Sequence, residues 1–191
     1  LGNGLHDAGR HEEALTVQEA DLAMERRLGA SEDAILTVQC ALAITYGDLG
    51  NMEKALSMER DVYSGSVKLY GEESRDTLLA AGNYAVSLKC LKHFEEARSV
   101  LREVMPVARR VLGENDTLPF RMRKVYAEVL YRDPAATLDD LREAVTTLAE
   151  TVLSRTVNGA GHSVRSVFCA TSFSAVFRRS SGRCSSPLAL S

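Results

Sequence analysis

Tryptophan is absent from the 191-residue sequence, aromatic residues make up only 6%, and there are four prolines. A sequence so poor in aromatic residues is not typical of a β-sandwich, so we expect helices. Long apolar runs are missing too, because no stretch approaches the ~18 consecutive apolar residues of a membrane-spanning helix. The chain starts at Leu1 without a charged-then-apolar leader, which indicates a fragment rather than a secreted precursor.

Cysteines are few and widely spaced, and no two of them form a CxxC pair. None stands near a histidine at the spacing of a zinc site, so the cysteines predict no bound metal. This pattern is typical of a protein from a reducing compartment, and we expect a cytoplasmic location. The four positions are Cys40, Cys90, Cys169 and Cys184.

Acidic residues are missing after Glu150, although the formal net charge of the whole chain is −3. Residues 156–191 contain nine Ser and four Arg and form a basic, Ser-rich tail. Three interpretations are open: a segment that binds anionic surfaces or directs targeting, a disordered end, and sequence from outside the native reading frame. We expect a disordered tail and no nucleic-acid partner, because its charges lack the repeated pattern of a nucleic-acid-binding arm.

A 42-residue period organises the rest of the chain. Small residues recur at this interval as Ala43, Ala85 and Ala127, each after a large apolar or aromatic residue. A Leu-Gly or Tyr-Gly pair recurs at the same interval, and a further alanine series lies in the strings GRHEEAL, GNMEKAL and HFEEAR. Several series in one register are hard to obtain by chance, so the chain is a repeat protein.

Each repeat is expected to consist of two helices. In the second unit, Ala43 and Tyr46 lie on one stripe of a helix over residues 33–48, and a second helix starts at Met52. Asn51 is a candidate N-cap for that second helix, and the Gly of each Leu-Gly or Tyr-Gly pair suits a left-handed C-terminal position. Candidate caps for the first helices are Ser31, Ser74 and Asp116.

These hairpins predict an all-α, right-handed α-solenoid of about 3.5 stacked repeats, because one hairpin cannot bury its apolar stripe alone. The expected units are residues 1–29 (partial), 30–71, 72–113 and 114–155, followed by the tail at 156–191. In the last unit Asp133-Pro134 interrupts the period, and the amphipathic helix that follows carries Leu138, Leu141, Val145, Leu148 and Val152 on one face. A HEAT or armadillo array, whose period also reaches ~40–47 residues, is the structural alternative.

The repeat resembles the 42-residue tetratricopeptide repeats of kinesin light chains and related proteins. In that family the first helix carries Asn-Leu-Ala, a Gly-x-x-x-Glu-Ala string follows, and the second helix ends in Leu-Gly. Asn83-Tyr84-Ala85 and Phe94-Glu95-Glu96-Ala97 match well, whereas the strings around Ala43 and Ala127 lack the Asn. The resemblance covers about residues 1–155 and implies a module for protein–protein interaction.

The resemblance also implies that the first helices line a concave groove that holds peptides. Carried over by register, the predicted peptide-binding residues are Asn83, Val86, Lys89, Arg121, Lys124, Glu128, Tyr131 and Arg132. Those from Arg121 to Tyr131 follow each other at i, i+3, i+7 and i+10 on one helical stripe. We therefore expect a groove for an extended peptide with acidic residues, which bind the cations while Tyr131 provides an anchor. The alternative is a row of solvated charges on an exposed helix.

No residue pattern predicts catalysis, a metal site or a cofactor. The histidines form no ligand pair on a helix face, since His6 and His11 are five residues apart across a turn. The glycines of Gly2–Gly9 lack the GxGxxG spacing of a phosphate-binding loop. We expect a non-enzymatic adaptor or scaffold for protein or peptide partners, with cargo binding in a motor complex as its most specific form. The alternative is a regulatory or substrate-recruiting domain of a larger, enzymatic protein.

Overall fold

The computed structural model describes the backbone of residues 2–158 and the side chains of residues 2–151. This part of the chain forms eight α-helices and no strand, which confirms the expected all-helical repeat fold. The helices are α1 (Gly2–Asp7), α2 (His11–Leu28), α3 (Glu32–Asp48), α4 (Met52–Tyr70), α5 (Arg75–Cys90), α6 (Phe94–Leu112), α7 (Thr117–Arg132) and α8 (Leu138–Asn158). Within the described residues, no helix combines the length and the hydropathy needed to cross a membrane. The sequence predicts a disordered tail over residues 156–191. Residues 159–191 of this segment lie outside the described residues.

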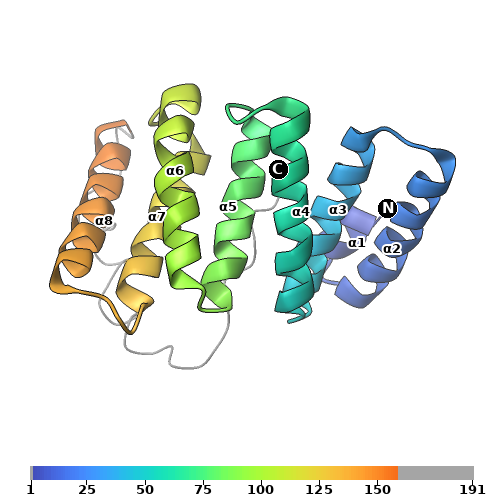
Figure 1. Ribbon diagram of the computed structural model, residues 1–191, viewed down its shortest axis with the longest axis horizontal. Helices are drawn as coiled ribbons and strands as arrows, with labels where there is room; N and C mark the ends of the chain where they lie inside the picture. Colours follow the sequence, from blue (N-terminus) through green and yellow to red (C-terminus); the bar gives the residue numbers. More distant parts are fainter. Residues whose placement is uncertain (1, 159–191) are drawn as a thin grey trace.

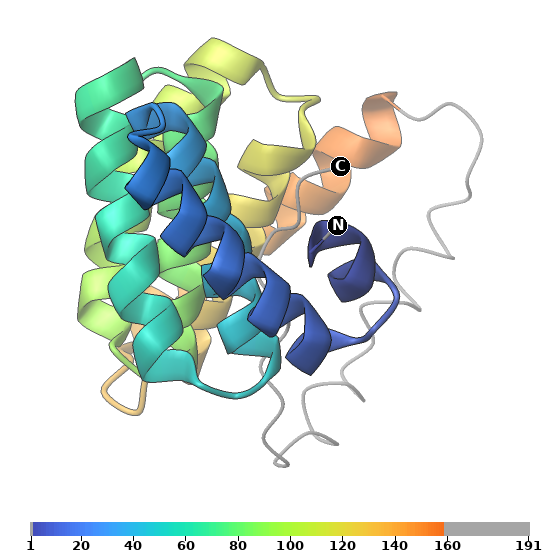
Figure 2. The same cartoon turned by 90° about the vertical axis from the view of Figure 1, so that its right-hand side faces the viewer.

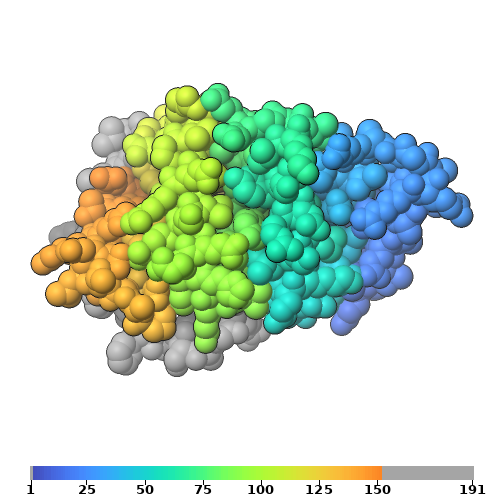
Figure 3. Space-filling view, viewed as in Figure 1, coloured from blue at the N-terminus to red at the C-terminus, as the bar shows by residue number. Residues whose placement is uncertain are grey.

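Successive helices pack against each other in a row, and short turns reverse the chain between them (Figure 1). The view from one end shows the short helix α1 next to α2, to which a tight turn joins it (Figure 2). Helix α5 also packs against α7, so these two first helices lie side by side. The hairpins stay in close contact along the whole row (Figure 3). The arrangement gives α5 and α7 a common surface, on which the predicted site residues lie.

Alanines at the repeat positions allow neighbouring helices to approach each other closely. A tight helix crossing needs a small side chain at the contact, with a larger neighbour filling the space beside it. The alanines concerned are Ala14, Ala43, Ala55, Ala85, Ala97 and Ala127, and each is 0% exposed. Leu88, Leu101 and Leu130 are among the larger residues of the core around Ala85, Ala97 and Ala127. The positions that the 42-residue period singled out are therefore core positions.

The turn inside each of the first three hairpins contains one residue with positive φ. Gly9 and Gly50 hold this place in the first two hairpins, and Lys92 holds it in the third, at φ 64°. The amide of Asn51 donates to the carbonyl of Tyr46 and closes the second turn. The expectation that Asn51 caps α4 is wrong at the level of its side chain, which makes no capping hydrogen bond. Its backbone, at φ −84° and ψ 65°, is not in the extended conformation that directs a capping side chain toward the helix.

The first helices have the side-chain caps that the sequence predicts. The Ser31 hydroxyl accepts from the amide of Ala34, and the Asp116 carboxylate accepts from the amide of Leu118 at 2.8 Å. Ser74 caps α5 in the same way. Because these caps satisfy backbone donors that the helix itself leaves unpaired, they fix where α3, α5 and α7 begin.

The last hairpin departs from the prediction at its apolar stripe. Asp133-Pro134 separates α7 from α8 as expected, but Leu138 is 72% exposed and Val145 is 68% exposed. Helix α8 packs against α7 and buries Ala144 and Thr151 instead. The stripe lies on the outer face of α8, because in a solenoid each hairpin uses one face for the preceding unit and another for the next.

Candidate peptide-binding surface

Helix α7 carries most of the predicted site. Its cations Arg121, Lys124 and Arg132 are exposed, and Tyr131 is half-buried. Across residues 2–151, whose side chains the structure describes, none of these three cations forms an ion pair. The guanidinium group of Arg132 lies 6.0 Å from the centroid of the Tyr131 ring. Helix α7 therefore presents positive charge without counter-ions beside an aromatic ring.

Helix α5 contributes residues of another kind. Asn83 and Val86 are buried, although the register had placed them among the peptide contacts. The Nδ2 atom of Asn83 lies 4.0 Å from the Sγ atom of Cys40 on α3, so this side chain links two neighbouring first helices. In the structure these residues form the base of the surface, and α7 provides its accessible groups.

Lys89 of α5 and Glu128 of α7 bind each other. Their Nζ and Oε2 atoms are 2.7 Å apart, and the two side chains are only 3% and 14% exposed. A charge pair removed from water attracts strongly, and its two charges cancel at a distance. The prediction placed both residues in contact with a peptide, whereas the structure uses them to join the two helices that line the surface.

A cavity of about 540 Å³ lies between α6, α7 and α8, and its walls include Arg123 but none of the predicted residues. Arg123 is almost fully buried, and its Nη1 atom lies 3.4 Å from a Glu114 oxygen. Its Nε and Nη2 atoms have no hydrogen-bond partner in the described part of the chain. Sequence reasoning missed this residue because it lies on a different face of α7 from Arg121. The available signal was a break in the repeat, since 42 residues earlier the chain has Ala81.

Comparison with known proteins identifies the repeat. A family model described as tetratricopeptide repeat matches residues 35–76 and 77–117, which cover most of the hairpins α3–α4 and α5–α6. Residues 35–117 carry two tetratricopeptide repeats. No curated protein sequence matches it.

Solved structures share the fold of this tetratricopeptide array. BtubC (BKLC) from P. vanneervenii superimposes over 90% of this chain with a TM-score of 0.72 and 19% identity, and the chain spans 66% of that protein's length. A Podosopora anserina putative kinesin light chain with nearly identical TPR-like repeats gives a TM-score of 0.72 and 20% identity, over 84% of this chain and 74% of that one. A point-substituted form of the latter protein also gives 0.72 and 20%, over 82% and 72%. At these identities the likeness concerns the fold alone, and it confirms the expected stack of tetratricopeptide hairpins.

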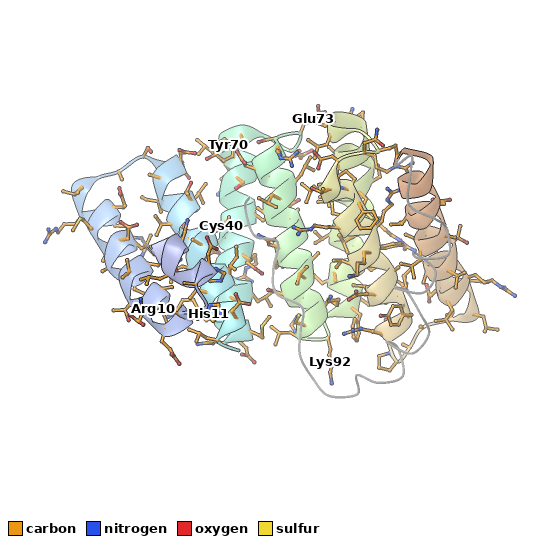
Figure 4. All side chains as sticks on the ribbon, turned by 180° about the vertical axis from the view of Figure 1, so that it is seen from behind. Arg10, His11, Cys40, Tyr70, Glu73 and Lys92 are labelled. Carbon is orange, nitrogen blue, oxygen red and sulfur yellow. The ribbon has the colours of Figure 1, made fainter. Side chains whose placement is uncertain are left out.

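Two buried titratable groups of the array have unusual environments. Burial raises the pKa of the Cys40 thiol to about 11, so this sulfur is protonated and a poor nucleophile at neutral pH (Figure 4). Burial also raises the pKa of the Glu59 carboxyl to about 8. The Ser87 hydroxyl faces this carboxyl, but neither oxygen of Glu59 is within hydrogen-bonding geometry of a described group. Both residues lie inside the helix packing.

Tetratricopeptide repeats, the family that the model matches, generally act as surfaces for protein–protein interaction.

Proposed function

We propose that the array binds an extended, acidic peptide segment of a partner protein along α7, and that it serves as an adaptor or scaffold. The observation that carries the proposal is the row of exposed cations Arg121, Lys124 and Arg132 beside Tyr131. Surface cations without counter-ions attract ligands of opposite charge, and guanidinium groups bind carboxylates through two parallel hydrogen bonds. An acidic peptide supplies the missing counter-charges.

The spacing of the row sets the length of the peptide. Arg121 and Lys124 are one helical turn apart, so their Cβ atoms are about 5–6 Å from each other. Arg132 follows Arg121 by eleven residues, or about 16 Å along the helix axis. Since an extended peptide rises about 3.3 Å per residue, about five residues span the row. We expect a ligand with acidic residues near both ends and an apolar side chain that packs on Tyr131.

The buried residues of the predicted set have a supporting role in this proposal. Lys89 and Glu128 join α5 to α7, and Asn83 and Val86 lie beneath the surface. The Lys89–Glu128 pair ties α7 to α5 and so favours one position of the cations on α7. A fixed arrangement lowers the entropy lost on binding.

Charge reversal on α7 tests the proposal. A fluorescein-labelled peptide of five to six residues with Glu near both ends is titrated with the chain at low salt, and fluorescence anisotropy is recorded. The variant Arg121→Glu/Lys124→Glu is expected to lose at least about tenfold in affinity, because like charges then face each other. The control Arg60→Glu/Lys68→Glu changes the net charge equally at exposed positions of α4. Equal affinities for the α7 variant and the native chain would rule out the site.

Cargo binding of the kinesin-light-chain type, in the cytoplasm, is the most specific form of the proposal. It is supported by the type of repeat, which the chain shares with the P. anserina putative kinesin light chain. Copurification of a motor subunit with the intact chain tests this form. A chain that binds acidic peptides but retains no motor subunit would remove the motor role and leave peptide binding in place.

A further inference from the structure

The N-terminal end of the array brings two histidines and an aspartate together. His6 lies in the last turn of α1, His11 begins α2, and Asp48 ends α3. One potential ligand atom from each lies within 4.8 Å of the other two. The Nε2 atom of His6 is 2.7 Å from Oδ2 of Asp48, and the His6 and His11 rings meet edge to face with centroids 4.9 Å apart. Figure 4 shows His11 at the junction of α1 with α2.

The repeat explains how these residues meet. His6 and Asp48 are 42 residues apart and hold the same position in successive first helices, which lie side by side. His11 is brought to them by the tight turn at Gly9, where the amide of Arg10 donates to the carbonyl of Leu5. His6 and His11 share no helix face, as the sequence predicts, but the turn at Gly9 places them together. A helix-based search for ligand pairs misses such a cluster.

His11 differs in type from the residues at the equivalent position of the next two hairpins. The first residue of the second helix is Met52 in the next hairpin and Phe94 in the one after, and both are partly buried apolar residues. At the equivalent, partly buried position of the first hairpin stands the imidazole of His11. Its Nδ1 atom is buried and has no hydrogen-bond partner in the described part of the chain. A buried polar atom that no protein group satisfies needs another partner, such as a water molecule or an ion.

We propose that His6, His11 and Asp48 bind a divalent transition-metal ion of the zinc class. Two imidazole nitrogens and one carboxylate oxygen form a set of three protein ligands that suits Zn²⁺ and leaves a fourth position for water. Tetrahedral zinc with bonds of about 2.0 Å holds its ligand atoms about 3.3 Å apart. In the structure Nε2 of His6 and Oδ2 of Asp48 are closer than this, at 2.7 Å, and all three ligand atoms lie within 4.8 Å of one another, so the side chains readjust when the ion binds.

Metal binding by His6 requires a change in the protonation of its ring. A carboxylate only accepts, so Nε2 of His6 donates to Asp48 in the structure, and this nitrogen must give up its proton before it can bind a metal ion. A neutral imidazole that binds a metal ion through Nε2 carries its single ring proton on Nδ1, so neutral His6 changes tautomer by exchanging protons with solvent. Nδ1 of His6 lies 3.7 Å from a carboxylate oxygen of Asp7. Carboxylates in this position commonly orient a metal-bound histidine.

A bound ion links three consecutive helices. Helix α1 consists of six residues and packs against α2, whereas Asp48 belongs to α3. Coordination by all three side chains ties α1 to the second hairpin, so metal binding and the folding of the N-terminal end are coupled. This site is independent of the proposed peptide surface on α7.

Titration of the intact chain with Co²⁺ and Zn²⁺ tests the proposal. Co²⁺ is expected to give the visible absorption of a low-symmetry site at one equivalent, Zn²⁺ is expected to displace it, and Zn²⁺ is expected to raise Tm. Each of the variants His6→Ala, His11→Ala and Asp48→Asn should weaken Co²⁺ binding at least about tenfold and abolish the Tm shift. The control His93→Ala removes an exposed histidine of the third hairpin and should bind like the native chain.

Circular dichroism of each variant without metal separates loss of the site from loss of the fold. Should one variant fail to fold, the other two carry the test, because each removes a different ligand. Native-like Co²⁺ binding by two folded ligand variants, or no saturable binding by the native chain, would overturn the proposal.

Discussion

The ammonium group of Lys89 on α5 lies 2.7 Å from a carboxylate oxygen of Glu128 on α7, and both side chains are shielded from water. This pair joins the two first helices whose surface we propose as the peptide-binding site. It also removes one cation from the predicted basic groove, so the charge available to a ligand comes from α7.

Breaking this pair is expected to destabilise the array. Glu128→Gln leaves the buried ammonium of Lys89 without its counter-charge, which costs about 3 kcal/mol in the free energy of unfolding. The double variant Lys89→Met/Glu128→Leu removes both charges and should recover most of the loss. Urea unfolding followed by circular dichroism measures both effects. Equal stability of Glu128→Gln and the native chain would show that the pair does not hold α5 and α7 together.

The buried carboxyl of Glu59 predicts a dependence of stability on pH. Burial raises its pKa from 4.5 to about 8, so the folded state holds a proton that the unfolded state releases. Stability is fully present below pH 4.5 and falls as the pH rises toward 8, by about 3 kcal/mol at pH 7. Glu59→Gln cannot ionise, so its advantage over the native chain should grow from near zero at pH 4.5 to this value. An advantage that does not change with pH would contradict the account.

Lys92 is the one residue other than glycine with positive φ in the described part of the chain. Lys92→Gly is expected to stabilise the array by about 0.5–1 kcal/mol, because glycine adopts this conformation without the steric cost of a Cβ atom. Gly50→Ala, at the equivalent turn, should destabilise it by a similar amount. Thermal unfolding of both variants measures the effect. A Tm for Lys92→Gly below that of the native chain would contradict the geometry of the turn.

A core leucine and an exposed valine of the array should respond differently to substitution. Leu101 is 0% exposed, and Leu101→Ala should cost about 3 kcal/mol in the free energy of unfolding. Val145 lies on the exposed stripe of α8, and Val145→Ser should change stability by less than about 0.5 kcal/mol. Urea unfolding compares the two variants. A large loss for Val145→Ser would show that the stripe is covered in solution.

The sequence predicted most of the fold because repeats multiply a weak local signal. One alanine at a helix position means little, but Ala43, Ala85 and Ala127 in one register mark the same helix crossing three times. The end of the array has no such repetition. The stripe around Leu138 and Val145 has the pattern of a core face because its partner in a solenoid is the next hairpin.

The candidate sites were harder to predict because their contacts lie between helices. The sequence placed Lys89 among the free cations, since nothing in it indicates that Glu128, 39 residues away, meets this side chain. His6 and His11 were dismissed as a ligand pair because spacing on one helix was the criterion, while the turn at Gly9 brings them together. Periodicity assigns a residue to a face but does not identify its partner across the interface.

The most direct test of the central claim, an acidic peptide bound along α7, is a charge swap. Arg121→Glu/Lys124→Glu should lose affinity for the acidic peptide and gain affinity for the same peptide with each Glu replaced by Lys. The native chain should show the reverse preference, and both preferences should weaken as salt rises. Loss of the acidic peptide together with gain of the basic one places the ligand at these two residues. A variant that binds both peptides as the native chain does would contradict the account.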